Sequence, residues 1–363
     1  MKFRSLLSEA MRNISCGTAG AAALMLAVLF GGTLLGGWEA WSVIELEGEA
    51  ESRIAANADV KTVLGSPIDG VACDRLSRGA GDSGLSQSGA MRAGQQVTPL
   101  STPGRDIASY EVTAGMLGLL VTGDANATVD ASGVWVSNDV AQDFGLVQGS
   151  RFETDRGVVR VAGVFDWPND GRDTRFTYAI ITPVAALGGT FEECWAKQWP
   201  ASDQLDMLLY STVISDGGSS QSMAGVTQLN KGFDSHYDAQ SSYALRMTRW
   251  MPFVGVGLGL LIGVISVRRR RLEYAGALHV GQTKGAQLLG IMMETLVWNG
   301  GGLICSTALL TALAMRWSPG SPELVLLAAV RTPLAIFAVV MLASLTTGLT
   351  IRESQLFRYF KNR

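Results

Sequence analysis

Four long stretches without any charged residue constrain this chain more than any other feature of its sequence. They cover Asn13–Trp38, Trp250–Val267, Thr295–Met315 and Thr332–Ile351. A helix needs about 20 apolar residues to cross a bilayer core, and lipid offers no hydrogen bonds to an open backbone. A buried core helix is the alternative for any one stretch, as is a signal peptide for the first. Four stretches in one chain with only 17% charged residues predict four transmembrane helices instead.

Lysine and arginine residues beside these stretches predict the orientation, because cytoplasmic loops carry an excess of them. They lie before the first stretch, after the second and after the fourth: Lys2, Arg4, Arg12, Arg268, Arg269, Arg270, Arg271, Lys284, Arg352, Arg358, Lys361 and Arg363. We therefore expect a multi-pass protein of the cytoplasmic (inner) membrane with both termini in the cytoplasm. The segment 39–249, with 27 acidic and 15 basic residues, is expected outside. The chain's net charge of −3 gives no reason to expect nucleic acid as a partner.

The predicted segments follow from these stretches and their flanks. They are a cytoplasmic amphipathic helix at 1–14, transmembrane helices at 15–43, 249–267, 288–315 and 324–351, an extracytoplasmic α+β domain with its stalk at 44–248, a cytoplasmic coupling helix at 268–287, an outer loop at 316–323 and a cytoplasmic tail at 352–363. The expected fold class is an α-helical membrane protein with an extracytoplasmic α+β domain between its first and second transmembrane helices.

The outer domain shows short strand patterns separated by turn residues. Residues 134–140 read as a strand that runs into a short helix, and 176–183 read as another strand. Residues 151–155 and 157–165 predict a hairpin, since alternating apolar positions flank an Asp-Arg-Gly turn. Residues 77–106 are rich in Ser, Gly, Gln and Pro, and we interpret them as a flexible loop or linker.

Two of the four cysteines, Cys73 and Cys194, fall in the outer domain. An oxidising exterior permits a disulfide between them, and two independent thiols are the alternative. His236 and Asp238 lie close in sequence, but a chain with two histidines offers no metal-ligand pattern. We therefore predict no metal site.

The stretch 268–302 carries the most specific pattern, RRRRLEYAGALHVGQTKGAQLLGIMMETLVWNGGG. An arginine cluster leads to Glu273, a glycine turn follows at Gly281, and Glu294 comes before a glycine cluster. This stretch resembles the signature of FtsX-domain permeases of ABC transporters, the group that contains MacB and LolC/LolE. His279 stands where that family commonly has Ala, and Gly276 interrupts the helix. The outer segment 137–165 also resembles the family's periplasmic core.

The resemblance implies that a separate protein supplies the energy for this chain. It implies a MacB-like periplasmic core and a set of ATPase-coupling residues: Arg270, Arg271, Glu273, Leu278, Gly281, Lys284 and Glu294. No G-x-x-x-x-G-K-[ST] motif and no nucleophile–base–acid set is present, so we expect a non-catalytic subunit without cofactors. ATP and Mg would be held by a cytoplasmic ABC ATPase dimer. The other expected partners are the lipid bilayer and a second permease subunit, as a homodimer or a heterodimer.

The function implied by the resemblance is ATP-driven export or extraction (efflux) of a hydrophobic or peptide substrate through motion of the outer domain. One alternative is an FtsX-like signal transmitter that regulates a cell-wall hydrolase. Another is a haem or lipid-like exporter, for which Tyr237 and Met247 could contact the ligand.

Overall fold

The computed structural model describes residues 12–13, 20–79, 84–121, 129–202, 204–214 and 224–355. The chain divides into two compact units. The first, the helical unit, comprises Met1–Glu49 and Ser241–Arg363; the second, the sheet unit, is Ala50–Gln240. Most of the predicted amphipathic helix at 1–14 and of the tail at 352–363 lies outside the described residues.

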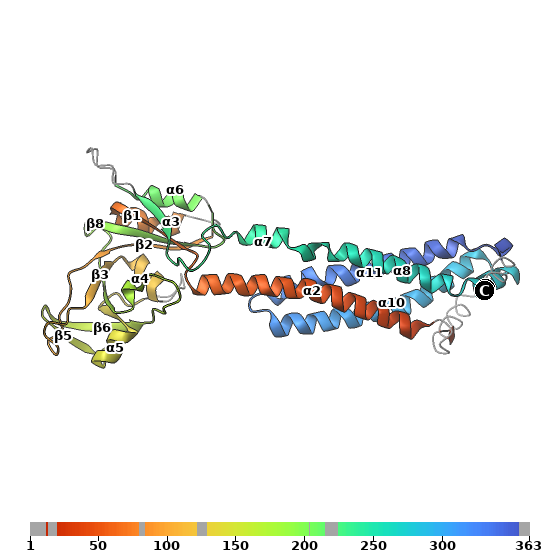
Figure 1. Ribbon diagram of the computed structural model, residues 1–363, viewed down its shortest axis with the longest axis horizontal. Coiled ribbons are helices and arrows are strands. Elements are labelled where there is room, and N and C mark those ends of the chain that lie inside the picture. The colour runs from red at the N-terminus through yellow and green to blue at the C-terminus, as the bar shows by residue number, and fades with distance from the viewer. Residues whose placement is uncertain are drawn as a thin grey trace. The chain divides into compact units, whose positions relative to one another are not determined.

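Four long helices make up most of the helical unit and run beside one another (Figure 1). They are α2 (Ala21–Ala55), α8 (Met251–Arg268), α10 (Lys284–Trp317) and α11 (Pro322–Thr350). The short elements are α7 (Ala239–Leu245), the 3₁₀ helices η2 (Met247–Trp250) and η3 (Glu353–Gln355), and α9 (Arg271–His279). Within the described residues, four helical segments are long and apolar enough to cross a membrane, the second being α7–α8 taken together. The predicted fold class, four such helices with a sheet domain between the first and second, is confirmed.

Glycines let α8 approach α11 closely. Gly255, Gly259 and Gly263 are four residues apart and therefore lie on one face of α8. A Cβ atom on Gly259 would lie 2.9 Å from the carbonyl oxygen of Ile336, and one on Gly263 would lie 2.7 Å from Cβ of Ala343. Small residues at this spacing bring helix backbones together in membranes, where packing rather than water exclusion holds helices.

Four tryptophans are exposed around one end of the helical unit. They are Trp38 and Trp41 of α2, Trp250 before α8, and Trp317 at the end of α10. The rings of Trp41 and Trp317 lie 5.9 Å apart between centroids. Exposed tryptophan rings collect at the boundary between lipid and water, so this end is expected to meet a membrane surface.

The sheet unit contains one nine-stranded mixed sheet with the order β5-β6-β4-β7-β3-β2-β8-β1-β9. The strands are β1 (Val60–Asp69), β2 (Leu85–Ala93), β3 (Ala108–Val112), β4 (Val134–Ser137), β5 (Arg151–Thr154), β6 (Gly157–Phe165), β7 (Ala179–Pro183), β8 (Thr190–Gln198) and β9 (Gly225–Gln228). The helices are α3 (Gly70–Gly79), α4 (Ala114–Val121), α5 (Asn138–Phe144), α6 (Gln204–Tyr210) and η1 (Thr174–Phe176). β5 and β6 pair antiparallel, which confirms the predicted hairpin. The strand expected at 134–140 is present as β4 but ends at Ser137, and 138–140 already belong to α5. The strand expected at 176–183 is present as β7, which begins at Ala179 after η1.

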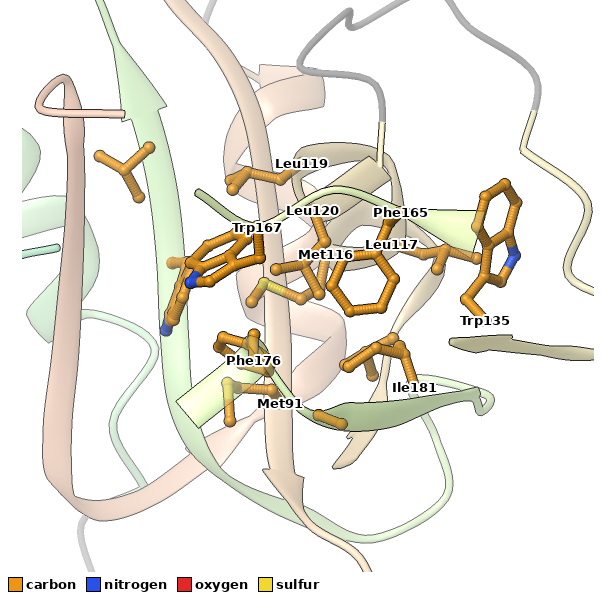
Figure 2. Close-up of a cluster of buried hydrophobic side chains, with 14 of the residues drawn as sticks. Met91, Met116, Leu117, Leu119, Leu120, Trp135, Phe165, Trp167, Phe176 and Ile181 are labelled. Carbon is orange, nitrogen blue, oxygen red and sulfur yellow. The ribbon is translucent and has the colours of Figure 1, made fainter. Parts of the chain in front are cut away.

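Large aromatic and sulfur-containing side chains fill the main core of the sheet unit. Figure 2 shows Met91, Met116, Trp167 and Phe176 grouped in this core, which also contains the fully buried Trp195. The ring of Phe176 meets that of Trp195 edge-on, at 5.7 Å between centroids. Such pairs stabilise by about 0.5–1.5 kcal/mol beyond the burial of their apolar area.

The prediction of a flexible loop over 77–106 was wrong for 77–79, the end of α3, and for 85–93, whereas 94–106 contain turns and isolated bridges. Residues 85–93 form β2, an inner strand between β3 and β8, and most of its side chains are buried. Its small residues are a packing requirement, because a Cβ atom on Gly89 would lie 1.9 Å from the backbone nitrogen of Met116 in α4. The composition of this strand resembles that of a linker, because α4 crosses it at Gly89 too closely for a larger side chain there.

A disulfide joins α3 to the sheet. Cys73 of α3 and Cys194 of β8 are bonded, with 5.9 Å between their Cα atoms, and both are buried. The bond closes a loop of 121 residues. The bond therefore holds α3 against β8, although the two elements are far apart in the sequence.

Candidate functional site

A cluster of polar side chains gathers where α8 ends and α9 begins. We call Asn13, Arg270, Glu273, Tyr274 and Glu294 the basal cluster. The guanidinium of Arg270 lies 2.5 Å from Oε2 of Glu294 through Nη1 and 2.7 Å from Oε2 of Glu273 through Nε. Asn13 donates from Nδ2 to Oε1 of Glu294 at 2.7 Å, and Arg270 donates to the Tyr274 hydroxyl at 3.3 Å. Both oxygens of the Glu294 carboxylate are therefore used.

The chain path explains how residues 24 positions apart come together. Gly281, at φ 97°, allows the reversal after α9, a conformation that suits glycine alone. Thr283 then starts α10, its hydroxyl accepting from the Ala286 backbone nitrogen. At 1.5 Å per residue, α9 runs about 12 Å away from Arg270, and the ten residues from Lys284 to Glu294 return about 15 Å. Two short antiparallel helical segments thus place Glu294 level with Arg270.

Because the ion pair is buried, each of its two charges needs the other. The side chains of Arg270 and Glu294 are only 11% and 9% exposed. A buried charge that loses its partner destabilises a fold strongly, so these two residues hold each other in place. Burial and the negative charge of Glu294 also raise the pKa of the Tyr274 hydroxyl, which stays protonated beside the pair. The start of α9 is thereby fixed to α10.

The other predicted coupling residues lie in several places. Lys284 donates from Nζ to the carbonyl oxygens of Gly348, at 3.0 Å, and Ile351. Its positive charge therefore lies at the C-terminal end of α11. Arg271 and Leu278 are half-buried in α9, and Gly281 forms the turn described above. The structure thus brings Arg270, Glu273 and Glu294 together and assigns different surroundings to the remaining four residues.

Sequence reasoning missed three residues around this site. Asn13 and Gln287 carried no recognisable pattern, although a polar residue inside an apolar helix is a general signal of a buried contact. Gln287 is 2% exposed, and neither of its amide atoms has a hydrogen-bond partner within the part of the chain that the structure describes. Val280, 88% exposed, was not singled out, although an apolar residue beside a turn glycine is a recognisable candidate for contact with a partner.

A second buried ion pair lies at the opposite end of α8. Arg246, just before η2, places Nη2 2.6 Å from Oε1 of Glu39 in α2, and their side chains are 7% and 2% exposed. Farther along α2, Glu47 accepts hydrogen bonds from the hydroxyls of Ser318 and Ser321 in the turn between α10 and α11. Helix α2 is therefore tied by its acidic side chains to the residues before α8 and to the α10–α11 turn. Partners 207 residues apart could not be paired from the sequence.

Among residues 12–13, 20–79, 84–121, 129–202, 204–214 and 224–355, no three His, Cys, Asp or Glu side chains are grouped to hold a metal ion. The side chain of His236 is 93% exposed, beside Asp234. The described arrangement joins helices through buried charges.

Comparison with known proteins gives structural neighbours for part of this chain. No family model and no curated protein matches the sequence. The chain is similar to the periplasmic region of MacB from Actinobacillus actinomycetemcomitans, with 8% identity, a TM-score of 0.33, and coverage of 47% of this chain and 89% of that one. It is similar to a domain of a protein described as a permease from Porphyromonas gingivalis, with 11% identity, a TM-score of 0.33, and coverage of 50% and 93%. It is also similar to the extracellular domain of the noncanonic ABC-type transporter YknZ from Gram-positive bacteria, with 17% identity, a TM-score of 0.28, and coverage of 41% and 88%.

Proposed function

We propose that this chain is the permease subunit of an ABC transporter of the FtsX-domain type, driven by a separate cytoplasmic ATPase dimer. The observation that carries the proposal is the hairpin of α9 and the start of α10, held by the buried Arg270–Glu294 pair between two apolar helices. The sequence resemblance of residues 268–302 assigns the same hairpin to ATPase coupling.

The contacts of the helical unit provide a route for movement. A partner that pushes on the exposed turn at Val280 and Gly281 would move α9. The Arg270–Glu294 pair would carry that movement to α10, and the close glycine contacts of α8 would carry it to α11. Helix α2, tied to Arg246, extends to Ala55 and so has its last residues in the sheet unit. ATP and Mg stay on the ATPase throughout.

The work done outside would be export or extraction of a hydrophobic or peptide substrate by motion of the sheet unit. In this proposal the basic residues beside the apolar helices place both termini in the cytoplasm and the sheet unit outside the inner membrane. Arg268 and Arg269, both exposed, would lie among anionic headgroups, each adding about 1 kcal/mol of attraction near the surface. A second permease subunit, identical or related, would complete the complex.

The test is co-expression of the full chain with each ABC ATPase encoded in the same genome, followed by purification and measurement of ATP hydrolysis in lipid nanodiscs. Wild type is expected to retain one ATPase and to stimulate it. Val280→Asp, at the exposed turn, is expected to lower stimulation about tenfold, the change produced by about 1.4 kcal/mol of lost contact energy. The matched control is Leu187→Asp, equally exposed in the sheet unit, which should leave stimulation unchanged.

Two results would contradict the proposal. One is that no ATPase is retained and none is stimulated by the chain. The other is that Val280→Asp and Leu187→Asp behave alike. Recovery of a cell-wall hydrolase by the sheet unit, with a retained ATPase but no transported substrate, would favour the signal-transmitter alternative.

A further inference from the structure

A cavity of about 730 Å³ opens in the sheet unit beside the edge strand β9. Its wall includes Val226, Thr227 and Gln228 of β9 itself. Phe233 and Tyr237 from the following loop and Asp206 from α6 also line it. Cavities of about 300–1,000 Å³ are the size in which proteins bind small molecules and short segments.

Among the described residues, the backbone of β9 has one paired edge and one open edge. β9 is the last strand of the sheet, and its register joins it to β1 alone among the described strands. The Leu229 N–H donates to the Val60 carbonyl at 3.0 Å, so Leu229 and, by alternation, Thr227 and Gly225 direct their backbone groups toward β1. Val226 and Gln228 therefore direct their N–H and C=O groups away from the sheet.

Apart from its length of four residues, the open edge lacks the features that normally prevent strand pairing. Exposed edge strands are usually protected by lysine, proline, a bulge or a covering element. β9 reads Gly-Val-Thr-Gln, with no charge and no proline, and its pairing with β1 is regular across all four residues. An unprotected edge that borders a cavity is suited to accept another strand.

The cavity wall offers contacts for the side chains of such a strand. Alternate side chains of an added strand point to opposite faces of the sheet. The rings of Phe233 and Tyr237 provide apolar surface, while Asp206, paired with Lys61 at 2.6 Å, and the exposed Lys231 provide both signs of charge. A wall with both apolar and charged groups suits a polypeptide, because a polypeptide has a polar backbone and side chains of several kinds.

We propose that the cavity binds an extended polypeptide segment, which adds to the sheet as a strand beside β9. The backbone N–H and C=O groups of Val226 and Gln228 bind the segment's main chain, and the cavity wall selects its side chains. Main-chain hydrogen bonds supply the affinity in this mode of recognition, and side-chain pockets supply the specificity. The inference goes beyond the proposed function, because strand addition requires no ATPase and no movement.

The experiment uses the full chain in detergent micelles and a fluorescein-labelled nine-residue strand peptide, Lys-Thr-Val-Thr-Val-Thr-Val-Thr-Glu, with blocked ends. Fluorescence anisotropy is expected to show saturable binding to wild type. Val226→Pro removes the outward N–H and leaves the bonds to β1, since proline is tolerated where a strand's N–H faces outward. Val226→Ala is the matched control, because it loses the same apolar side chain and keeps the N–H.

The prediction is that Val226→Pro binds the peptide at least about tenfold more weakly than Val226→Ala, a loss of about 1.4 kcal/mol. A second probe keeps the test decisive even where Val226→Pro fails to fold. This probe is the same peptide methylated on two successive central amides, which blocks both of its edges, and wild type is expected not to bind it. Absence of saturable binding of the first peptide, equal binding of the two Val226 variants, or equal binding of the two peptides would overturn the proposal.

Discussion

Arg270 and Glu294 form a buried ion pair, 2.5 Å between Nη1 and Oε2, that fastens the segment after α8 to α10. Arg270 also donates to Glu273, and Glu294 also accepts from Asn13. The pair fixes the direction in which α9 leaves α8. Any force applied at the turn around Gly281 is therefore applied to two long helices together.

Removing one member of the pair should destabilise the helical unit. Arg270→Met leaves the buried Glu294 carboxylate without its cation, and a loss of about 3–5 kcal/mol is expected. The measurement is denaturant unfolding of the purified chain in micelles. Arg269→Met, at an exposed neighbouring arginine, is the control and should change little.

The double variant Arg270→Met/Glu294→Leu should recover most of the lost stability, because apolar side chains of similar size replace both charges. Equal unfolding free energies for Arg270→Met and Arg269→Met would show that the pair does not hold the hairpin.

The helices were the most predictable part of the fold, since membrane helices follow from apolar length alone. The β5–β6 hairpin was predictable too, because its alternation and its Asp-Arg-Gly turn are local signals. β2 was missed because its small residues look like those of a linker. Gly89 must be small because α4 crosses the strand at Met116, and the sequence alone does not show this crossing. Local composition reports what a segment contains and gives no information on what packs against it.

The candidate site was predictable only in part, and for the same physical reason. The arginine cluster, Glu273 and Glu294 were singled out because residues 268–302 resemble the signature of FtsX-domain permeases. Their mutual pairing depends on the lengths of α9 and of the first turns of α10, which the sequence marks poorly around Gly276. The Glu39–Arg246 pair joins residues that no local pattern connects.

The effect of replacing a glycine of α8 on the stability of the helical unit should depend on the face of the helix on which that glycine lies. Gly259→Leu would put side-chain atoms into the Ile336 backbone, whereas Gly257 has no atom within 4 Å of an added Cβ. Forced overpacking typically costs about 1–3 kcal/mol, so Gly259→Leu should lower the melting temperature in micelles. Gly257→Leu is the matched control on the same helix, and equal melting temperatures would contradict the observed contact of α8 with α11.

The Cys73–Cys194 bond should be present in the mature protein and should stabilise the sheet unit. Peptide mapping without reduction should recover the two cysteine-containing peptides as one species. A bond that closes a 121-residue loop is expected to contribute about 2–5 kcal/mol, so Cys73→Ala/Cys194→Ala should unfold at lower denaturant.

Cys305, a free and half-buried cysteine of α10, supplies the control variant Cys305→Ala, which should leave the sheet unit's stability unchanged. Alkylation of both Cys73 and Cys194 in the unreduced, denatured chain would contradict the bond.

The stability of the sheet unit should depend on pH through Asp59. Burial raises the pKa of this carboxyl to about 6, despite the positive charge of Lys197 at 3.8 Å. The folded chain therefore binds this proton more tightly than the unfolded chain, whose pKa is near 3.8. The free energy of unfolding should fall as pH rises from about 4 to about 7, by about 3 kcal/mol at about 1.4 kcal/mol per pKa unit.

The measurement is urea unfolding followed by tryptophan fluorescence at several pH values. Asp59→Asn cannot titrate, so the difference between wild type and this variant should change with pH across that window. A difference that stays constant over the whole window would exclude Asp59 as the cause.

The central claim is that the hairpin after α8 lies in the cytoplasm while the sheet unit lies outside, and cysteine labelling tests it most directly. In a background of Cys16→Ala/Cys305→Ala, single cysteines are introduced as Val280→Cys in the hairpin and Leu187→Cys in the sheet unit, both highly exposed. Spheroplasts are then treated with a maleimide that does not cross membranes. The account predicts labelling of Leu187→Cys in intact spheroplasts and of Val280→Cys only after lysis. Labelling of Val280→Cys in intact spheroplasts would contradict it.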